Sequence, residues 1–517
     1  MKVDVVIRKN TYYDSVTLML VTKEVKKING VIEVLVGMGT ELNKELAKGL
    51  KLATKETEAL TANDFFISVL AEKDSIIEEV VKKVDILLTQ KKSESSSEYR
   101  PSTIESALKY VPDLNLAVIS VPGKYAANEA EKALMNDLHV MLFSDNVSIE
   151  EERSLKELAR EKGLLMMGPD CGTAIINNVP LAFANVVSKG NIGIVGASGT
   201  GTQEVCVIID KLGMGVSQVI GTGGRDLKSE IGGIMMIQGM KALIEDPKTK
   251  VIVLISKPPT PEVTGKVLKL VHTSNKPVVV NFIGGDPKII KESGAYPCFT
   301  LEDAAYKAVA LAKGEDVKDF EGFSISEEVN KIVEEEVSKL DPEQKYLRGL
   351  YTGGTLADEA MNMLSKQIDG IYSNIPLDPR YKLKDINNSI KHTCLDLGDD
   401  EFTVGRPHPM IDPSTRVDRI VKEAEDDVAV ILMDFVLGYG SHEDPVGEML
   451  NSIKEAKKKM ASKGKYLSVI ASICGTDKDP QDLGNSKKRL EEIGVIVMPS
   501  NAQAVRLVYK ILEKVNS

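Results

Sequence analysis

The chain has 517 residues, of which 43% are hydrophobic and 27% are charged. This length and composition are typical of a globular protein with three or four domains. The net charge of −11 argues against a nucleic-acid surface and against an anionic membrane as partner. Trp is absent and aromatic residues make up 5%, which also argues against base-stacking platforms.

Cysteine usage and the N-terminus bear on the compartment. The five cysteines, an odd number without a C-x-x-C pair, indicate a reducing compartment and neither disulfides nor structural zinc. The segment MKVDVVIRKNTYYD lacks the apolar core of a signal peptide, and no apolar run reaches about 18 residues. We therefore predict a cytoplasmic protein that does not span a membrane. No cluster of metal-ligating side chains stands out.

The first 90 residues predict a small α+β domain. Strand-like segments at VDVVIRKN, VIEVLVGM and DFFISVLAE alternate with helix-like segments, the last of which reaches Leu88. The polar, Ser-rich stretch KKSESSSEYR, Lys91 to Arg100, is then expected to be a linker.

From residue 101 the chain alternates apolar strands with helices, which predicts parallel, doubly wound sheets. In residues 101–185, LNLAVISVP is expected to be a buried strand, and HVMLFSD and LLMMGPDCG are the next two, with a helix from Tyr125 to Met135. Residues 190–320 contain four more strands, GIVGASG, VSQVIGTGG, VIVLISKP and PVVVNFIGG. An acidic connecting helix leads to a last domain, residues 346–517, which contains five predicted strands. The expected fold is α/β: Rossmann-like and flavodoxin-like sheet domains after a small α+β domain.

The last two domains are predicted to be copies of one unit. Each opens with a Gly- and hydroxyl-rich loop, GIVGASGTGTQE from Gly193 and YTGGTLADEA from Tyr351. Each then continues with two apolar strands in the same order, although few residues are identical.

These two loops are candidate phosphate sites. A helix N-terminus carries unpaired N–H groups and the positive end of the helix dipole, and glycines let an anion approach the backbone. The alternative is an ordinary capped turn, since Ser and Thr cap helices anyway. Neither loop is a P-loop. The candidate phosphate-binding residues are Ser198, Gly199, Thr200 and Gly201 in the first loop and Gly353, Gly354 and Thr355 in the second.

Further polar residues follow predicted strands or lie one turn into a helix. Glu204 and Glu359 are similarly placed after the two loops and could orient a substrate or a partner group, and Glu204 is a candidate catalytic residue. The alternative is that each carboxylate interacts favourably with the helix dipole or caps a helix. Asp170 and Cys171, in GPDCGT, are candidate substrate-binding residues. Cys171 has no evident His neighbour, which favours a packed loop cysteine over a nucleophile.

Two arginines and one histidine complete the set of candidates. Arg225, in GTGGRD, has the planar fork that binds a carboxylate, or it forms a surface salt bridge. Arg406 and His408 lie between prolines in GRPHPMIDP, which restricts the loop backbone. Arg406 and His408 are candidate catalytic residues, and His408 could be a general acid or base or a hydrogen-bond donor.

The segments MMGPDCGT, KGNIGIVGASGTGTQE, GTGGRD, EDPKTKVIVL and KPVVVNFIGG resemble the α subunit of succinyl-CoA synthetases, over roughly residues 101–315. The later residues resemble a second CoA-ligase-type domain. With YTGGTLADEA and GRPHPMIDP, the whole arrangement resembles the FdrA family of acyl-CoA-synthetase-like proteins. The resemblance implies a CoA-binding-like Rossmann domain at 101–185 and CoA-ligase-type domains at 190–320 and 346–517. It also implies that the two loops face one another across a phosphoryl site.

The sequence departs from the synthetases at three points. The stretch Asp85–Arg100, where the synthetases carry a glycine-rich CoA loop, has no glycine, so CoA binding stays an open alternative. GGDPKIIKESGAYP lacks the histidine that the synthetases phosphorylate. No segment is left for an ATP-grasp domain.

The FdrA resemblance implies a subunit of an oxamate carbamoyltransferase of ureide (allantoin) catabolism. That enzyme moves a carbamoyl group between phosphate, as carbamoyl phosphate, and a small carboxylate such as oxamate, and here it would act with operon-encoded partner subunits in a homo- or hetero-oligomer. Two alternatives stay open. One is an acyl-CoA ligase subunit that needs an ATP-grasp partner, and the other is a non-catalytic regulatory scaffold.

Overall fold

The computed structural model describes residues 3–9, 11, 13, 15–93, 101–257, 259–403 and 406–516. Contacts between Cα atoms divide the chain into two compact units. The first comprises Met1–Pro112 with Thr403–Pro407, and the second comprises Asp113–Phe402 with His408–Ser517.

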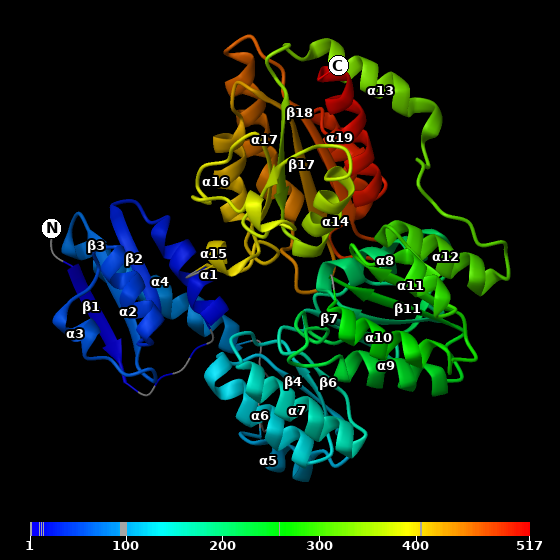
Figure 1. Ribbon diagram of the computed structural model, residues 1–517. Helices are drawn as coiled ribbons and strands as arrows, with labels where there is room; N and C mark the ends of the chain where they lie inside the picture. The colour runs from blue at the N-terminus through cyan, green and yellow to red at the C-terminus, as the bar shows by residue number, and fades with distance from the viewer. Residues whose placement is uncertain are drawn as a thin grey trace. The chain divides into compact units, whose positions relative to one another are not determined.

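The first unit is a small α+β fold, as the sequence predicts (Figure 1). Its antiparallel sheet has the order β1-β3-β2. Successive residues of β3 point to opposite faces, so Phe65 and Ile67 contact α1 and α4 while Phe66 packs with Leu52 on the other face. The predicted linker from Lys91 lies outside the described residues from position 94, and its first three residues end α4. The elements are β1 (Val3–Arg8), α1 (Ser15–Lys26), β2 (Val31–Met38), α2 (Glu41–Gly49), α3 (Lys55–Glu58), β3 (Phe65–Ala71), α4 (Asp74–Ser93) and α5 (Ile104–Tyr110).

The second unit begins with a three-stranded parallel sheet of order β4-β5-β6. The expectation of a buried first strand is wrong, because β4 is an edge strand. Of its four residues only Ile119 is buried, and Val118 is 53% exposed. The elements are β4 (Leu116–Ile119), α6 (Gly123–Met135), β5 (His139–Leu142), α7 (Ile149–Lys162) and β6 (Met166–Met167).

A seven-stranded sheet follows, in the order β13-β12-β11-β9-β10-β7-β8. Strands β9 to β13 are parallel, and β7 pairs antiparallel with both β10 and β8. Helices α8 and α12 cover one face, and α9 and α10 cover the other. The elements are β7 (Thr173–Ile176), β8 (Val179–Ala182), β9 (Lys189–Ala197), α8 (Gly199–Lys211), β10 (Val216–Gly221), α9 (Ile234–Glu245), β11 (Val251–Ser256), α10 (Pro261–Val271), β12 (Val278–Phe282), α11 (Pro287–Glu292), β13 (Tyr296–Pro297), α12 (Leu301–Lys313) and the connecting α13 (Ser326–Lys339).

The last sheet is six-stranded and parallel, in the order β15-β16-β14-β17-β18-β19. Helices α14 and α19 cover one face, and α16 and α17 cover the other. The elements are β14 (Tyr346–Tyr351), α14 (Gly354–Leu364), β15 (Ile371–Tyr372), a 3₁₀ turn (Pro379–Tyr381), β16 (His392–Asp396), α15 (Asp400–Thr403), α16 (Ser414–Glu423), β17 (Val428–Val436), α17 (Pro445–Ala461), β18 (Ser468–Cys474), α18 (Leu483–Glu492), β19 (Ile496–Met498) and α19 (Asn501–Val515).

The two larger sheets have the same strand order. The run β13-β12-β11-β9-β10 corresponds strand by strand to β19-β18-β17-β14-β16. Their helices α8, α12, α14 and α19 share one buried apolar cluster. In each copy the strand that precedes the Gly-rich loop is central, so the packing brings both loops to the shared helical layer.

Candidate functional site

The two Gly-rich loops meet in the structure. The hydroxyl of Ser198, the N-cap of α8, accepts the N–H of Gly201 at 3.1 Å and donates to Thr355 Oγ1 at 2.7 Å. A Cβ atom added to Gly201 would lie 2.8 Å from Thr355 Cγ2, and one added to Gly353 would lie 2.6 Å from Thr200 Oγ1. Glycine is therefore required at both positions so that the helix N-termini can touch.

The candidate phosphate residues differ in accessibility. Gly199 and Gly354, the first residues of α8 and α14, are half-buried, and the other five candidates are buried. An anion would therefore reach the paired helix ends on the side of these two glycines.

A carboxylate of the chain already binds part of the second loop. Asp434, on β17, accepts the N–H groups of Thr352 at 2.7 Å and Gly353 at 2.9 Å, and it also accepts the Thr352 hydroxyl at 3.0 Å. Arg416 lies 3.4 Å from the same carboxylate. At α14 an incoming anion would therefore meet Gly354 and Thr355 rather than Gly353.

Glu204 and Glu359 each cap a helix of the opposite copy. The N–H of Asn501, which begins α19, donates to Glu204 at 3.0 Å, and the N–H of Leu301, which begins α12, donates to Glu359 at 2.7 Å. Both glutamates are buried, and burial raises the pKa of Glu359 to about 7 and raises that of Glu204. The structure thus gives both glutamates a capping role between the copies, and the catalytic role of Glu204 stays a prediction.

A cluster of ionisable side chains that the sequence analysis did not single out lies beside Gly354. Lys257 follows β11 directly, and its Nζ lies 3.0 Å from Oδ2 of Asp358 on α14. A Cβ atom on Gly354 would collide with Oδ2 of Asp396, the last residue of β16, and would lie 3.3 Å from Lys257 Nζ. The carboxyl ends of β11 and β16, which belong to different sheets, therefore bring one ammonium group and one carboxyl group to the N-terminus of α14, which itself carries the second carboxyl group.

The electrostatics of the Lys257–Asp358–Asp396 cluster suit proton transfer. Burial raises the pKa of Asp396 to about 7, and it also raises the pKa of Asp358 against the opposing charge of Lys257. Desolvation lowers the pKa of Lys257, but the carboxylates of Asp358 and Asp396 outweigh it and raise the pKa overall. A charged ammonium next to a carboxyl group that titrates near neutrality is an arrangement typical of general acid–base sites.

Asp170, a candidate substrate-binding residue, belongs to the surroundings of this cluster. Burial raises its pKa to about 6, Asp145 raises it further, and the charge of Lys257 lowers it. Asp170 is exposed and Lys257 is half-buried, and desolvation by the surrounding protein is the largest influence on each pKa.

His408 lies near the second loop as a neutral ring. Its Nδ1 accepts the N–H of Met410 at 3.2 Å, and burial lowers its pKa to about 4. A Cβ atom on Gly398 would collide with His408 Nε2 and would lie 2.9 Å from the carbonyl oxygen of Thr352. Because Nδ1 accepts a hydrogen bond, the proton of the neutral ring is on Nε2. Of the two roles left open by the sequence, this geometry favours a hydrogen-bond donor.

The remaining candidates are not placed in the cluster. Arg406 is exposed and groups with the first compact unit, where its N–H donates to the Thr403 carbonyl at 3.0 Å. Arg225 forms an ion pair with Glu152 at 2.8 Å and donates to the Val147 carbonyl at 2.8 Å, so its salt-bridge alternative is observed.

Cys171 is a packed loop cysteine. It is 2% exposed, its thiol donates to the Thr173 carbonyl at 3.6 Å, and burial raises its pKa to about 12. These properties oppose a role as nucleophile, and its predicted contact with a substrate stays untested.

Comparisons with known proteins agree with this architecture. Three family models match, described as "AllF, heavy metal-associated domain" over residues 1–103, "CoA binding domain" over 187–284 and "CoA-ligase" over 350–511. The uncharacterized protein YahF of Escherichia coli K12 is 50% identical over 502 residues, which cover 97% of both chains. The chain belongs to the FdrA family. Its domains are acyl-CoA-synthetase-like, and its fold is the mixed α/β fold expected from the sequence. The CoA-binding match falls on the range for which the sequence analysis predicts the first CoA-ligase-type domain.

More distant relatives are ligase subunits. Subunit alpha 2 of the ADP-forming succinate–CoA ligase of Archaeoglobus fulgidus is 27% identical over 32% of this chain and 58% of that relative. The ADP-forming sulfoacetate-CoA ligase subunit SqwL of Acholeplasma sp is 27% identical over 35% of this chain and 62% of that relative. Among solved structures, the apo dinucleotide-forming acetyl-coenzyme A synthetase 1 of Ca. Korarchaeum cryptofilum covers 82% of this chain and 88% of its own, with 16% identity and a TM-score of 0.34.

The metal in the description of the N-terminal family model does not fit the residues present. Residues 1–103 contain neither Cys nor His, the thiolate and imidazole donors that soft and borderline metals prefer. Within the described residues, no group of three or more His, Cys, Asp or Glu side chains could hold a metal ion. We derive no metal chemistry for this domain. In the same part of the chain, no helix is long and apolar enough to cross a membrane.

Proposed function

We propose that this protein transfers an acyl group, specifically a carbamoyl group, between phosphate and a small carboxylate such as oxamate. The observation that carries the proposal is the position of Lys257 beside the half-buried N-terminus of α14, with the carboxyl groups of Asp358 and Asp396 next to it. A helix N-terminus and an ammonium group together bind a phosphoryl group, and a carboxyl group with a pKa of about 7 exchanges a proton at neutral pH.

In the proposed reaction the amide nitrogen of oxamate attacks the carbonyl carbon of carbamoyl phosphate. The new C–N bond gives oxalurate, the C–O bond to the phosphoryl group breaks, and phosphate leaves with the bonding electron pair. Asp396 accepts the proton that the attacking nitrogen loses. Lys257 and the α14 N-terminus offset the negative charge that grows on the leaving phosphate. The reverse reaction uses the same groups in opposite roles.

His408 and Asp170 are assigned the role of orienting the substrate. In this proposal the Nε2 proton of neutral His408 donates to a carbonyl oxygen, and Asp170, whose pKa the charge of Lys257 lowers, accepts a proton or an amide N–H. The substrate class itself comes from the FdrA resemblance. The chain lacks the histidine that the synthetases phosphorylate, which also supports direct transfer to phosphate.

A second candidate function is that of an acyl-CoA ligase subunit. The matches to CoA-binding and CoA-ligase family models favour it. It would require a partner that supplies the nucleotide-binding domain. The transferase also involves partner subunits, so the need for a partner does not distinguish the two functions. The acceptor of the acyl group does, because it is phosphate for the transferase and CoA for the ligase.

The test incubates the purified chain with oxamate and carbamoyl phosphate, both alone and together with the subunits encoded beside it. The assay measures phosphate release and oxalurate formation. Lys257→Met is expected to lower kcat/KM for carbamoyl phosphate about 10²- to 10³-fold, as loss of one stabilising donor does. Asp396→Asn is expected to remove the rise in rate through about pH 7. Lys288→Met, at an exposed position on α11, is the matched control and should keep wild-type rates.

The outcomes separate the candidates. Wild-type rates in both cluster variants would overturn the assignment of the site. Absence of turnover, combined with binding of CoA and acyl-CoA formation when ATP and an ATP-grasp partner are added, would favour the ligase. If the protein shows no turnover and binds neither phosphate nor CoA, the non-catalytic scaffold is the remaining alternative.

A further inference from the structure

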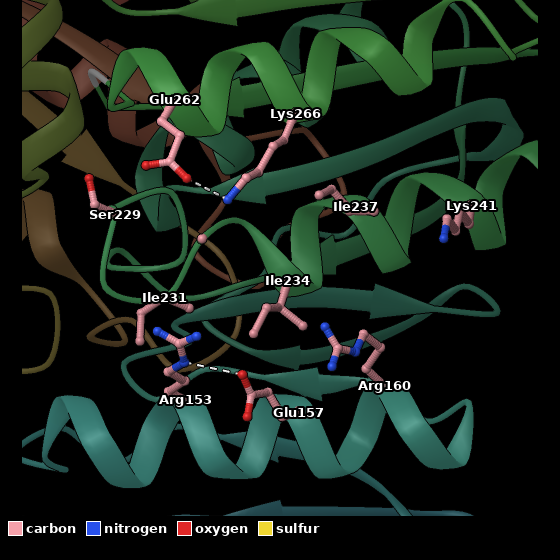
Figure 2. A pocket seen from close by; sticks show the side chains of 11 residues that line it. Arg153, Glu157, Arg160, Ser229, Ile231, Ile234, Ile237, Lys241, Glu262 and Lys266 are labelled. Carbon is pink, nitrogen blue, oxygen red and sulfur yellow. Dashed lines mark hydrogen bonds and ion pairs between the residues drawn. The ribbon is translucent and has the colours of Figure 1, made fainter.

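A cavity of about 500 Å³ lies between α7, α9 and α10 in the second unit, and the segment Ser229–Gly232 forms its rim. Figure 2 shows side chains of α7 and of α10 directed toward this rim and toward α9, which lie between them. None of the lining residues belongs to the cluster of Lys257, Asp358 and Asp396. The volume is within the range of small-molecule sites.

The cavity carries an excess of positive charge. Two of its four cations are compensated within it, since Arg153 pairs with Glu157 at 3.1 Å and Lys266 pairs with Glu262 at 2.7 Å (Figure 2). The side chains of Arg160 and Lys241 form no hydrogen bond or ion pair with the residues that the structure describes. In a chain of net charge −11, two uncompensated cations at one cavity favour an anionic ligand.

Apolar lining comes from α9. Ile234 and Ile237 are half-buried and contribute carbon surface next to the cations, whereas Ile231 in the rim is 2% exposed. A bare inorganic ion would leave this surface in contact with water. An anion with a carbon body would cover it, and the free energy of transfer of that body would add to the charge interaction.

The rim is held in place without a ligand. Arg153 donates to the Glu230 carbonyl at 3.1 Å, and Asp226 accepts the N–H of Met236 at 2.8 Å at the start of α9. The buried Lys156 in turn contacts Asp226 at 2.9 Å. A ligand would therefore bind a preformed cavity and would not have to order a loop.

We propose that this cavity is a second ligand site, distinct from the transferase site, that binds a small organic phosphate monoester. Arg160 and Lys241 hold the phosphoryl dianion, and Ile234 and Ile237 contact the organic part. The proposal does not depend on the activity proposed above, because it concerns other residues.

The test measures binding of phenyl phosphate to the purified full chain by isothermal titration calorimetry, with inorganic phosphate and benzyl alcohol as partial probes. We expect phenyl phosphate to bind at least tenfold more tightly than either partial probe. The double variant Arg160→Gln/Lys241→Gln is expected to weaken binding tenfold or more. Ser229→Glu, which adds a carboxylate at an exposed rim position, should weaken it similarly without disturbing the fold.

Two controls locate the binding. The double variant Lys288→Gln/Lys291→Gln removes two exposed cations of α11 outside the cavity and should leave the affinity unchanged. Lys257→Met should also retain it. Loss of binding in Lys257→Met, or unchanged affinity in both cavity variants, would overturn the proposal. Equal affinity for inorganic phosphate would overturn the assignment of an organic monoester.

Discussion

Replacement of Glu359 by Gln tests whether the carboxyl group between the two copies titrates as its surroundings dictate. Glu359 Oε1 accepts the Leu301 N–H at 2.7 Å and Oε2 accepts Asn501 Nδ2 at 2.8 Å. Gln is nearly isosteric and keeps the acceptor for Leu301. Burial raises the pKa of Glu359 from 4.5 to about 7, so between these values the folded state binds a proton that the unfolded state lacks. The stability contributed by this group is complete below pH 4.5 and is lost as the pH rises through about 7.

The magnitude follows from the size of the shift. The rise of this pKa from 4.5 to about 7 changes the free energy of unfolding by at most about 3 kcal/mol. Most of this change, about 2 to 3 kcal/mol, is expected between pH 5 and pH 8. The wild-type protein should therefore lose about 2 to 3 kcal/mol relative to Glu359→Gln over this interval.

Urea unfolding followed by far-UV circular dichroism at pH 5, 6, 7 and 8 measures the difference between the two proteins. Glu455→Gln, at an exposed position on α17, is the control, and its stability should run parallel to that of the wild type. If Glu359→Gln also runs parallel to the wild type within about 0.5 kcal/mol, burial does not hold a proton on Glu359 at neutral pH, and the pKa argument is refuted.

Three further predictions concern other parts of the second unit. Lys156→Met should lower the free energy of unfolding by about 3–5 kcal/mol in urea titrations, because it leaves the buried carboxylates of Glu152 and Asp226 without their shared ammonium partner; a loss below about 1 kcal/mol would contradict this. Gly201→Ala should cost about 1–3 kcal/mol, because its Cβ would lie 2.5 Å from the Ser198 hydroxyl. Gly199→Ala should be neutral or slightly stabilising, because the added Cβ would lie 3.7 Å from its nearest neighbour, Thr173 Oγ1. Equal losses of unfolding free energy in Gly201→Ala and Gly199→Ala would contradict the packing of the two loops. The five cysteines are all buried, so Ellman's reagent should label none in the native protein and all five in urea, and rapid native labelling would refute the burial.

Much of the fold could be predicted from local sequence patterns. The runs VIVLIS and VAVILMDFV are continuously apolar because both faces of a central parallel strand are covered by helices, and both are fully buried strands. The same rule fails for LNLAVISVP. Its apolar residues also suggest a buried strand, but β4 ends a three-stranded sheet and leaves Val118 exposed. Composition does not distinguish a central strand from an edge strand, because strand order is set by contacts that are distant in sequence.

Some residues of the candidate site could also be found from local sequence, and others could not. The loops at Ser198 and Gly353 could be found because glycine and hydroxyl residues between a strand and a helix have a local meaning. Lys257 carried no such signal, since a lysine that follows a strand is common at a surface. Its pairing with Asp358, 101 positions later in the chain, arises only because the two copies pack through their helices.

The sequence by itself determined the long apolar strands, the two helix N-termini and the family to which the chain belongs, because propensity, periodicity and motifs act over a few residues. The short strands β7, β8, β13 and β15 were not predicted. Only the tertiary structure decided which groups meet. In it, Glu204 and Glu359 each cap a helix of the opposite copy, and Arg225 forms an ion pair with Glu152. It also brought an ammonium group and two carboxyl groups to the end of α14. The physical reason is that a charge takes its pKa and its role from neighbours within a few ångströms, and those neighbours come from distant parts of the chain.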